Sequence, residues 1–416
     1  MTLTNIISAI GNTRSVYPLL LRDCGIEVPS KIYITRKENL KESKTKANDA
    51  TREKFIDEYV TSAVWLGGIP LVEKTYDKFI KNKGFNPSLS IKLFKEEKFQ
   101  GIDYNINKFR ELAPEAVKEL EKAKANRSLL EKLNAGKFTA AISIPVLLMG
   151  FVLPKLNFAL TRKIKENRKA NNQTQTNFNK NISMTSFAGE KNISFTGNWV
   201  TSVANLKTVD KMAITDGGLT VGRVSTSRNK DEAYVNAFRM IGSMFLNFVA
   251  PKYIQKALNS TANKLFNINV NLDPLIMENE EFISAIKENK VTLPKSSKAE
   301  DLFEFIDNNP NSLFSKIAQQ QKKVSFLKNG IRDPRKYVDI EALAEFRDEF
   351  EKFIKSASKS KNIDKFAKKA KFVKSANIIS NVLISSTLLA VVLPKIQYSF
   401  NKLVTGSYSD PGLADK

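Results

Sequence analysis

The chain has 416 residues, 42% of them hydrophobic, and carries 66 Lys and Arg against 43 Asp and Glu, a formal charge of +23. It has no histidine and one cysteine, Cys24. The lack of imidazole excludes Ser–His and Cys–His nucleophile pairs and histidine metal sites, and one cysteine excludes an intrachain disulfide. We therefore expect a protein that is not an enzyme and that uses no metal or cofactor.

Most of the basic residues are lysine, which is a point charge suited to anionic surfaces and poorly suited to bidentate phosphate or base recognition. We therefore expect anionic membrane lipids as the partner of the charged surface. Nucleic acid is not expected, whereas a protein partner or a second copy of the chain stays open.

Residues 1–51 hold short apolar patches and a charged run, and they predict a weakly structured segment with one extended piece at 31–35. No basic residue precedes Arg14 and no continuous apolar core follows it, so no cleaved signal peptide is expected.

Two short apolar segments occupy residues 59–72 and 240–251. The first is broken by Gly67-Gly68 and Pro70, and the second ends at Pro251. A straight helix needs about 20 apolar residues to cross a bilayer, so these segments predict interfacial, buried or re-entrant pieces. Whether they span is left open.

Two longer segments, 138–154 and 375–394, carry no charge and close on Val-Leu-Pro-Lys. An apolar–amide–aromatic triplet follows each, at 156–158 and 396–398. In water such helices would expose apolar surface on every side, so they predict membrane helices. Pro154 and Pro394 are interpreted as helix ends, with the next lysine at the headgroup level. Core helices of a soluble bundle are the alternative.

The spacing of these segments predicts an internal tandem duplication. The offset from Pro70 to Pro251 is 181, and the same offset places Phe85-Asn86 on Phe266-Asn267. The offset from Pro154 to Pro394 is 240, which implies an insert of about sixty residues in the second copy.

The predicted fold is therefore an all-α integral membrane protein with two copies of one unit. Its expected regions are the N-terminal segment 1–51, copy one over 52–170, a flexible Asn/Ser/Thr-rich linker with a Gly loop over 171–227, copy two over 228–405 with a helical insert at about 268–374, and the tail 406–416.

Basic residues beside the long segments are the candidate lipid-headgroup site. These are Lys365, Lys368, Lys369, Lys371, Lys374, Lys395, Lys155, Arg162 and Lys163. A positive-inside flank without a specific ligand explains the same charges. The four prolines that interrupt or close the apolar segments are the candidate helix-break positions, namely Pro70, Pro154, Pro251 and Pro394.

Three further patterns favour structural roles. The glycines of 217–222 have the spacing of a phosphate loop, but Arg223 and Val224 replace its Lys and Ser/Thr, which favours a turn before a helix. The acidic residues of 341–349 are interleaved with Arg347 and predict an ion-paired helix face. Arg239, beside the second short segment, is expected to snorkel to a surface.

At Trp65 to Pro70, at Asp216 to Lys230 and at Phe195 to Asn198, the chain resembles a functionally uncharacterised family of bacterial multi-pass membrane proteins. The resemblance implies a bacterial cytoplasmic membrane location and no particular substrate, cofactor or catalytic residue.

The function expected from the sequence is that of a non-enzymatic structural or interaction component of the membrane, which binds anionic lipid or a partner through basic amphipathic helices. A transporter or channel built on the repeat is the first alternative, and a soluble helical scaffold is the second.

Overall fold

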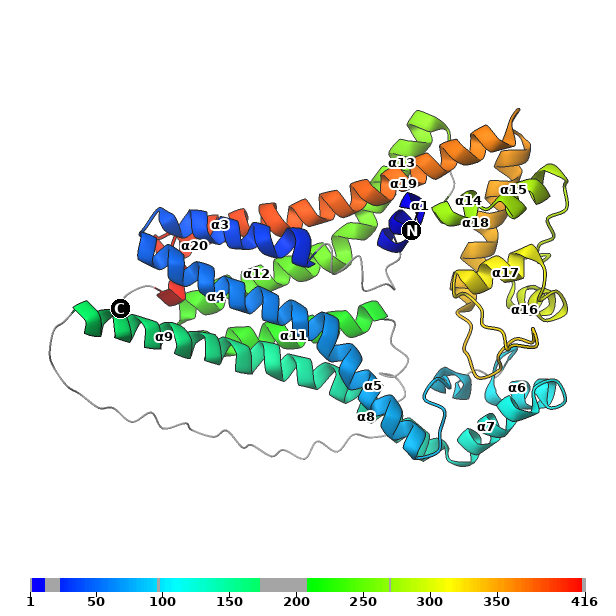
Figure 1. The fold of residues 1–416 in the computed structure, drawn as a ribbon, viewed down its shortest axis with the longest axis horizontal. Helices are drawn as coiled ribbons and strands as arrows, with labels where there is room; N and C mark the ends of the chain where they lie inside the picture. Colours follow the sequence, from blue (N-terminus) through cyan, green and yellow to red (C-terminus); the bar gives the residue numbers. More distant parts are fainter. Residues whose placement is uncertain (1, 12–22, 96–97, 173–207, 269–270, 414–416) are drawn as a thin grey trace. The chain divides into compact units, whose positions relative to one another are not determined.

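The computed structural model describes residues 2–11, 23–95, 98–172, 208–268 and 271–413 (Figure 1). Within these ranges the chain is helical and forms no strand beyond one isolated antiparallel bridge between Phe326 and Arg332. The all-α prediction is confirmed for this part of the chain.

The described chain divides into two compact units. Unit 1 comprises residues 1–22, 74–134 and 249–386, and unit 2 comprises residues 23–73, 135–248 and 387–416. Each unit combines segments from both halves of the sequence, so the units do not follow the two predicted copies.

Unit 1 is built around the region predicted as an insert. Its helices are α1 (Leu3–Gly11), most of α5 (Ile69–Asn82), η3 (Ile91–Phe94), α6 (Ile102–Phe109), α7 (Pro114–Ala125), the start of α8 (Arg127–Val146), α13 (Ala250–Phe266), α14 (Pro274–Met277), α15 (Glu280–Lys287), α16 (Ala299–Asn308), α17 (Leu313–Gln320), α18 (Ile340–Ser358) and nearly all of α19 (Ile363–Thr387).

The core of unit 1 is aromatic. Phe346, Phe350 and Phe353 recur at helical spacing on α18, and the rings of Phe282 and Phe314 pack on Phe350 with centroids 4.5 and 5.6 Å apart. Full burial of each such side chain contributes about 1.5–3 kcal/mol, so the insert carries a core of its own.

Unit 2 consists of helices joined in pairs. Its elements are η1 (Asp23–Glu27), α3 (Val28–Leu40), α4 (Lys44–Ala63), η2 (Val64–Gly68), the end of α8, η4 (Leu147–Val152), α9 (Leu153–Asn172), α11 (Thr208–Ser225), α12 (Lys230–Met244), most of η5 (Phe245–Val249), η6 (Leu388–Val392), α20 (Leu393–Thr405) and η7 (Pro411–Leu413).

The packing of unit 2 is reciprocal. Helix α3 packs on α4 and α11 packs on α12, while α4 contacts α9 and α12 contacts α20. In addition, α11 packs on the π-helical turn η4 and α3 packs on the π-helical turn η6 (Figure 1). Within unit 2, α3, α4 and α9 thus have counterparts in α11, α12 and α20 that make corresponding contacts.

All four apolar segments contain a π-helical turn that ends two residues before a proline. The turns η2, η4, η5 and η6 precede Pro70, Pro154, Pro251 and Pro394, respectively. Proline has no N–H, and its ring clashes with the carbonyl four residues back in a regular α-helix. In η4 the backbone N–H of Leu153, the residue before the proline, donates a hydrogen bond to the carbonyl of Leu148, five residues back. This bond widens the helical turn.

The sequence predicted that the helices end at Pro154 and Pro394, but both helices continue past these prolines. They run without interruption from Arg127 to Ala170 and from Ile363 to Thr405. The most apolar stretch of each is only 33% and 28% buried, and by length and composition both qualify as candidate membrane spans.

The buried face of the two long helices repeats at the offset of 240. Met149 and Leu389 are fully buried. Asn157 and Gln397 are nearly buried, at 5% and 7% exposed. Lys155 and Lys395 are exposed in both.

Two predicted unstructured regions are helical instead. Residues 31–35 lie inside α3 rather than in an extended piece, and residues 208–225 of the expected linker form α11. The glycines of the expected loop lie inside α11, where Gly222 faces Gly150 so closely that an added Cβ would lie 2.8 Å from the Gly150 Cα. Gly218 and Gly222, four residues apart, permit close helix packing, as small-xxx-small spacing does.

Candidate functional site

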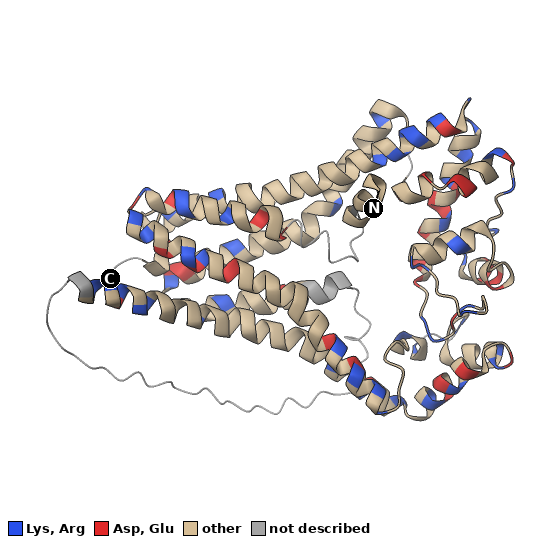
Figure 2. Cartoon of the chain, viewed as in Figure 1, with Lys and Arg blue, Asp and Glu red and all other residues tan. Residues whose placement is uncertain are grey.

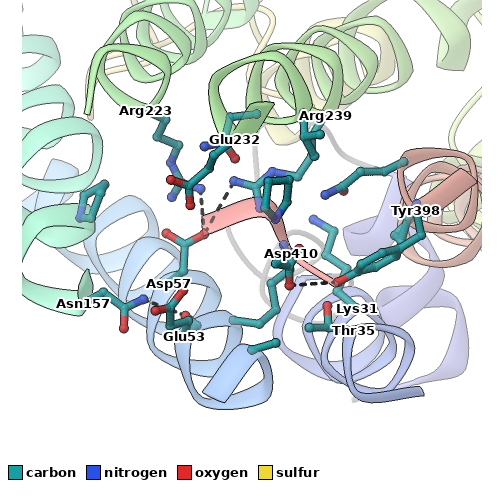
Figure 3. A pocket seen from close by; sticks show the side chains of 18 of the residues that line it. Lys31, Thr35, Glu53, Asp57, Asn157, Arg223, Glu232, Arg239, Tyr398 and Asp410 are labelled. Atoms are coloured by element: carbon teal, nitrogen blue, oxygen red, sulfur yellow. Dashed lines mark hydrogen bonds and ion pairs between the residues drawn. The ribbon is translucent and has the colours of Figure 1, made fainter. Parts of the chain in front are cut away.

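A cavity of about 100 Å³ lies within unit 2, among α3, α4, α9, α11, α12 and α20 (Figure 3). Its lining is unusually rich in ionisable groups. These are Lys31, Glu53, Lys54, Asp57, Arg223, Arg228, Glu232, Arg239 and Asp410. Burial of charges is costly unless they are paired, so the pairing of each group decides what the cavity can bind.

Asp57 of α4 is shared by two arginines. Arg223 at the end of α11 donates to the Asp57 carboxylate at 2.7 Å and to the Thr61 hydroxyl at 2.9 Å, while Arg239 of α12 lies 3.8 Å from the same carboxylate. Figure 3 shows Asp57 between the two guanidinium groups. These three side chains are 8–16% exposed. Arg239 therefore points into unit 2, whereas the sequence predicted that it snorkels to a surface.

Arg228 forms a second cluster with two carboxylates. Its guanidinium donates to both oxygens of Glu53 at 3.0 Å and to Glu232 at 2.7 Å, and it stacks 4.1 Å from the centre of the Phe158 ring. Burial raises the pKa of the Glu53 carboxyl, and the contact with Arg228 opposes this effect.

Two lysines share the carboxylate of Glu58. Lys54 lies 2.8 Å from Glu58, and Lys31 lies 2.5 Å from Glu27 and 3.4 Å from Glu58. Lys54 precedes the apolar segment 59–72, and its burial, together with the nearby Arg239 charge, lowers its pKa to about 8.

Asp410 enters the cavity from the C-terminal loop. Its carboxylate accepts from the Tyr398 hydroxyl and from the Asn39 amide, each at 3.3 Å, and its backbone N–H donates to Asn39 at 3.1 Å. Burial raises the pKa of this carboxyl. The loop is thus held against α3 and α20 by polar groups.

The two triplets noted in the sequence meet at this cavity. Asn157 and Phe158 line it from α9, and Gln397 and Tyr398 line it from α20. The Asn157 amide nitrogen donates to the Glu53 carbonyl at 2.8 Å, whereas its Oδ1 is buried without a hydrogen-bond partner. Pro154 and Pro394 also line the cavity, so the helix-break positions of the long segments belong to the site.

The outer surface of unit 2 has the opposite character. Large apolar side chains are more than half exposed on its helices, among them Leu71, Leu147, Leu156, Val221, Ile241 and Leu403. In Figure 2 the stretch where α8 leads into α9 carries no charge, and Lys and Arg lie toward the end of α9. Unit 2 thus has ionisable groups around its cavity and exposed apolar side chains on its outer surface.

The predicted headgroup residues are divided between the two units. Lys155, Arg162, Lys163 and Lys395 belong to unit 2 and are exposed, with Arg162 at 4.0 Å from Glu166. The others lie at the start of α19 in unit 1.

The α19 lysines split into two groups. Lys365, Lys368 and Lys369 are exposed beside Phe372, which is 68% exposed. Lys371 pairs with Glu278 at 3.2 Å and Lys374 bonds to Asn271, both within unit 1. Phe366 and Val373 pack in the unit 1 core, so part of the expected interfacial face is used internally.

The acidic helix face is ion-paired, as predicted for Asp348 and Glu349. Arg347 lies 3.2 Å from Asp348, and Lys352 lies 2.8 Å from Glu349. In the described ranges no three acidic or cysteine side chains converge as a metal site would require.

Sequence reasoning missed the charged cavity. Asp49, Glu53 and Asp57 recur every four residues, which places three acids on one face of a helix. Glu53 pairs with Arg228, and Asp57 pairs with Arg223 and Arg239, all more than 160 residues later, whereas Asp49 pairs with Arg52 and Arg168. The acidic face could have been predicted from this spacing. The arginines that pair with it could not, because a single sequence does not reveal contacts between distant residues.

Comparison of the chain with protein-family models, with curated proteins and with solved structures found no match. The resemblance to uncharacterised bacterial membrane proteins therefore stays an expectation, and its motif at 195–198 lies outside the described residues.

Proposed function

We propose that the chain is an integral membrane protein of non-enzymatic function that moves a small polar solute, with unit 2 as the transporting part. The observation that carries this proposal is the charge-lined cavity enclosed by helices whose outer sides are apolar. Charged groups at membrane depth face bundle interiors and mark solute pathways in membrane proteins.

The internal duplication supports a transporter in particular. We infer that α3, α4 and the α8–α9 helix correspond to α11, α12 and the α19–α20 helix, because their contacts, their π-helical turns and their buried positions recur. Transporters built on repeats bind their solute where interrupted helices of the two repeats meet. The cavity lies beside Pro154 and Pro394, which follow the π-helical turns of the two long helices.

Lipid binding through the basic start of α19 is a second candidate function. It is favoured by the exposed Phe372 next to Lys365, Lys368 and Lys369. Co-purification of phosphatidylglycerol with the detergent-solubilised chain tests it. Replacement of these three lysines by glutamine is expected to reduce the amount of phosphatidylglycerol retained, and an unchanged amount would contradict the lipid role.

Transport is tested by osmotic swelling of proteoliposomes in sodium lactate, glycine or choline chloride. The purified chain is expected to accelerate swelling in at least one of them. Ser243 lines the cavity, so Ser243→Trp is expected to block the effect, while Ser399→Trp on the exposed side of α20 is the matched control.

Two results would count against transport. Recovery of the protein in the soluble fraction without detergent would favour the soluble scaffold. Correct membrane insertion with no accelerated swelling would leave the lipid-binding component as the better account.

A further inference from the structure

The charges around the cavity are not evenly matched. Arg228 has two carboxylate partners, and Lys31 and Lys54 share Glu27 and Glu58. Arg223 and Arg239, in contrast, share the single carboxylate of Asp57. Asp57 thus lies against two guanidinium groups, and Arg239 also interacts at longer range with the buried carboxylates of Glu58 and Asp410.

Two buried polar atoms of the lining lack a partner. The Nε of Arg223 is a donor and the Oδ1 of Asn157 is an acceptor, and both residues are more than nine-tenths buried at 7% and 5% exposed. A buried unsatisfied polar atom costs about 1–3 kcal/mol, so a ligand that supplies the missing partners gains affinity. One atom needs an acceptor and the other needs a donor.

We propose that the cavity binds a small oxyanion that carries a hydroxyl or amino group next to its charged group. The oxyanion is placed against Arg239 and the Nε of Arg223, and the hydroxyl or amine donates to the Oδ1 of Asn157. The site thereby deepens the proposed transport function by naming its solute class. The same chemistry occurs in free hydroxy acids and in the phosphoglycerol headgroup of a lipid.

Isothermal titration of the full chain in detergent tests the site, with lactate, propionate and glycerol 3-phosphate as ligands and choline as the cationic comparison. Lactate and propionate differ by one hydroxyl. Lactate and glycerol 3-phosphate are expected to bind at least about tenfold more tightly than propionate, because only they satisfy Asn157. Choline is expected not to bind.

The variants separate the two contacts. Arg239→Gln is expected to weaken lactate binding at least about tenfold, since it removes a charged donor, and Arg239→Lys is expected to restore most of it. Asn157→Leu is expected to make lactate and propionate bind equally. The exposed residues Arg36 and Asn167 provide the matched controls Arg36→Gln and Asn167→Leu, which should bind as the wild type does.

A third arm identifies the source of the ligand. If phosphatidylglycerol nanodiscs block lactate binding and phosphatidylcholine nanodiscs do not, the site takes a lipid headgroup; if neither blocks it, the ligand is a free solute. The proposal is overturned if the folded wild type binds neither lactate nor glycerol 3-phosphate, or if Arg239→Gln and Asn157→Leu behave like their controls. Lactate binding without vesicle swelling would support the site and count against transport, whereas swelling without anion preference would do the reverse.

Discussion

The Arg228 cluster inside unit 2 depends on the geometry of its side chains. Arg228 presents its planar donors to Glu53 and Glu232 and its flat face to Phe158, an arrangement that lysine cannot reproduce. Loss of one member of a buried ionic cluster leaves its partners without compensation, which costs more than the pair itself contributes.

Replacement of Arg228 by methionine is therefore expected to destabilise the protein by about 3 kcal/mol, because Glu53 and Glu232 lose their shared cation. The measurement is thermal unfolding in detergent. The exposed pair Arg162–Glu166 supplies the control, and Arg162→Met is expected to change stability by less than about 0.5 kcal/mol. Equal effects of the two variants would show that the Arg228 cluster is not buried in the functional state.

The lowered pKa of Lys54, about 8 against 10.5, predicts a pH dependence. Between these values the unfolded chain binds more protons at this residue than the folded chain does, so stability rises with pH across the window. The unfolding midpoint of the wild type is expected to rise more from pH 8 to pH 10 than that of Lys54→Met. If the unfolding midpoints of the two proteins change equally from pH 8 to pH 10, Lys54 is well solvated.

At the level of single elements, the π-helical turns decide which residues face the cavity. One extra residue in η6 rotates everything after it by about 100° relative to a regular helix. Gln397, Tyr398 and Asn401 of α20, which follow that turn, are buried. The apolar pattern and the prolines could be read from the sequence. The sequence did not reveal that a π-helical turn before each proline lets the helix continue past it.

Deletion of Val391 within η6 is expected to remove the extra residue. The helix would then return to regular α geometry, set the Pro394 ring against the carbonyl four residues back and turn the polar face of α20 outward, at a cost of about 3 kcal/mol or more. Pro394→Ala, which keeps the register, is expected to cost less than about 1 kcal/mol. Size-exclusion chromatography and thermal unfolding distinguish them, and a well-folded deletion variant would refute the role of the turn.

The glycines of α11 show a second limit of sequence reading. Their spacing fitted a loop, yet Gly222 is required by the close approach of Gly150 on η4. Gly222→Ala is expected to cost about 2 kcal/mol, since backbone atoms cannot yield as a side chain can.

Gly217 lies in the same helix with no atom within 4 Å of an added Cβ. Gly217→Ala is therefore expected to stabilise the helix by about 0.5–1 kcal/mol. Thermal unfolding of both variants in the same detergent gives the comparison, and destabilisation of equal size would contradict the packing described for α11.

For the molecule as a whole, the sequence predicted the helical class and the two long apolar helices. It did not predict α3 and α11, because their apolar residues are few and their stability comes from packing on α4 and α12 and on the π-helical turns. It also did not predict how the halves of unit 2 exchange contacts, since such pairing depends on residues far apart in the chain.

The central claim is that the apolar outer side of unit 2 faces lipid while its charges face inward. A spin label at Leu147→Cys, in a Cys24→Ser background and in liposomes, tests this claim directly, because Leu147 is 55% exposed on the outer side of η4. The account predicts frequent collisions of the label with molecular oxygen and few with a water-soluble nickel chelate. Frequent collisions with the nickel chelate would place this surface in water and contradict the account.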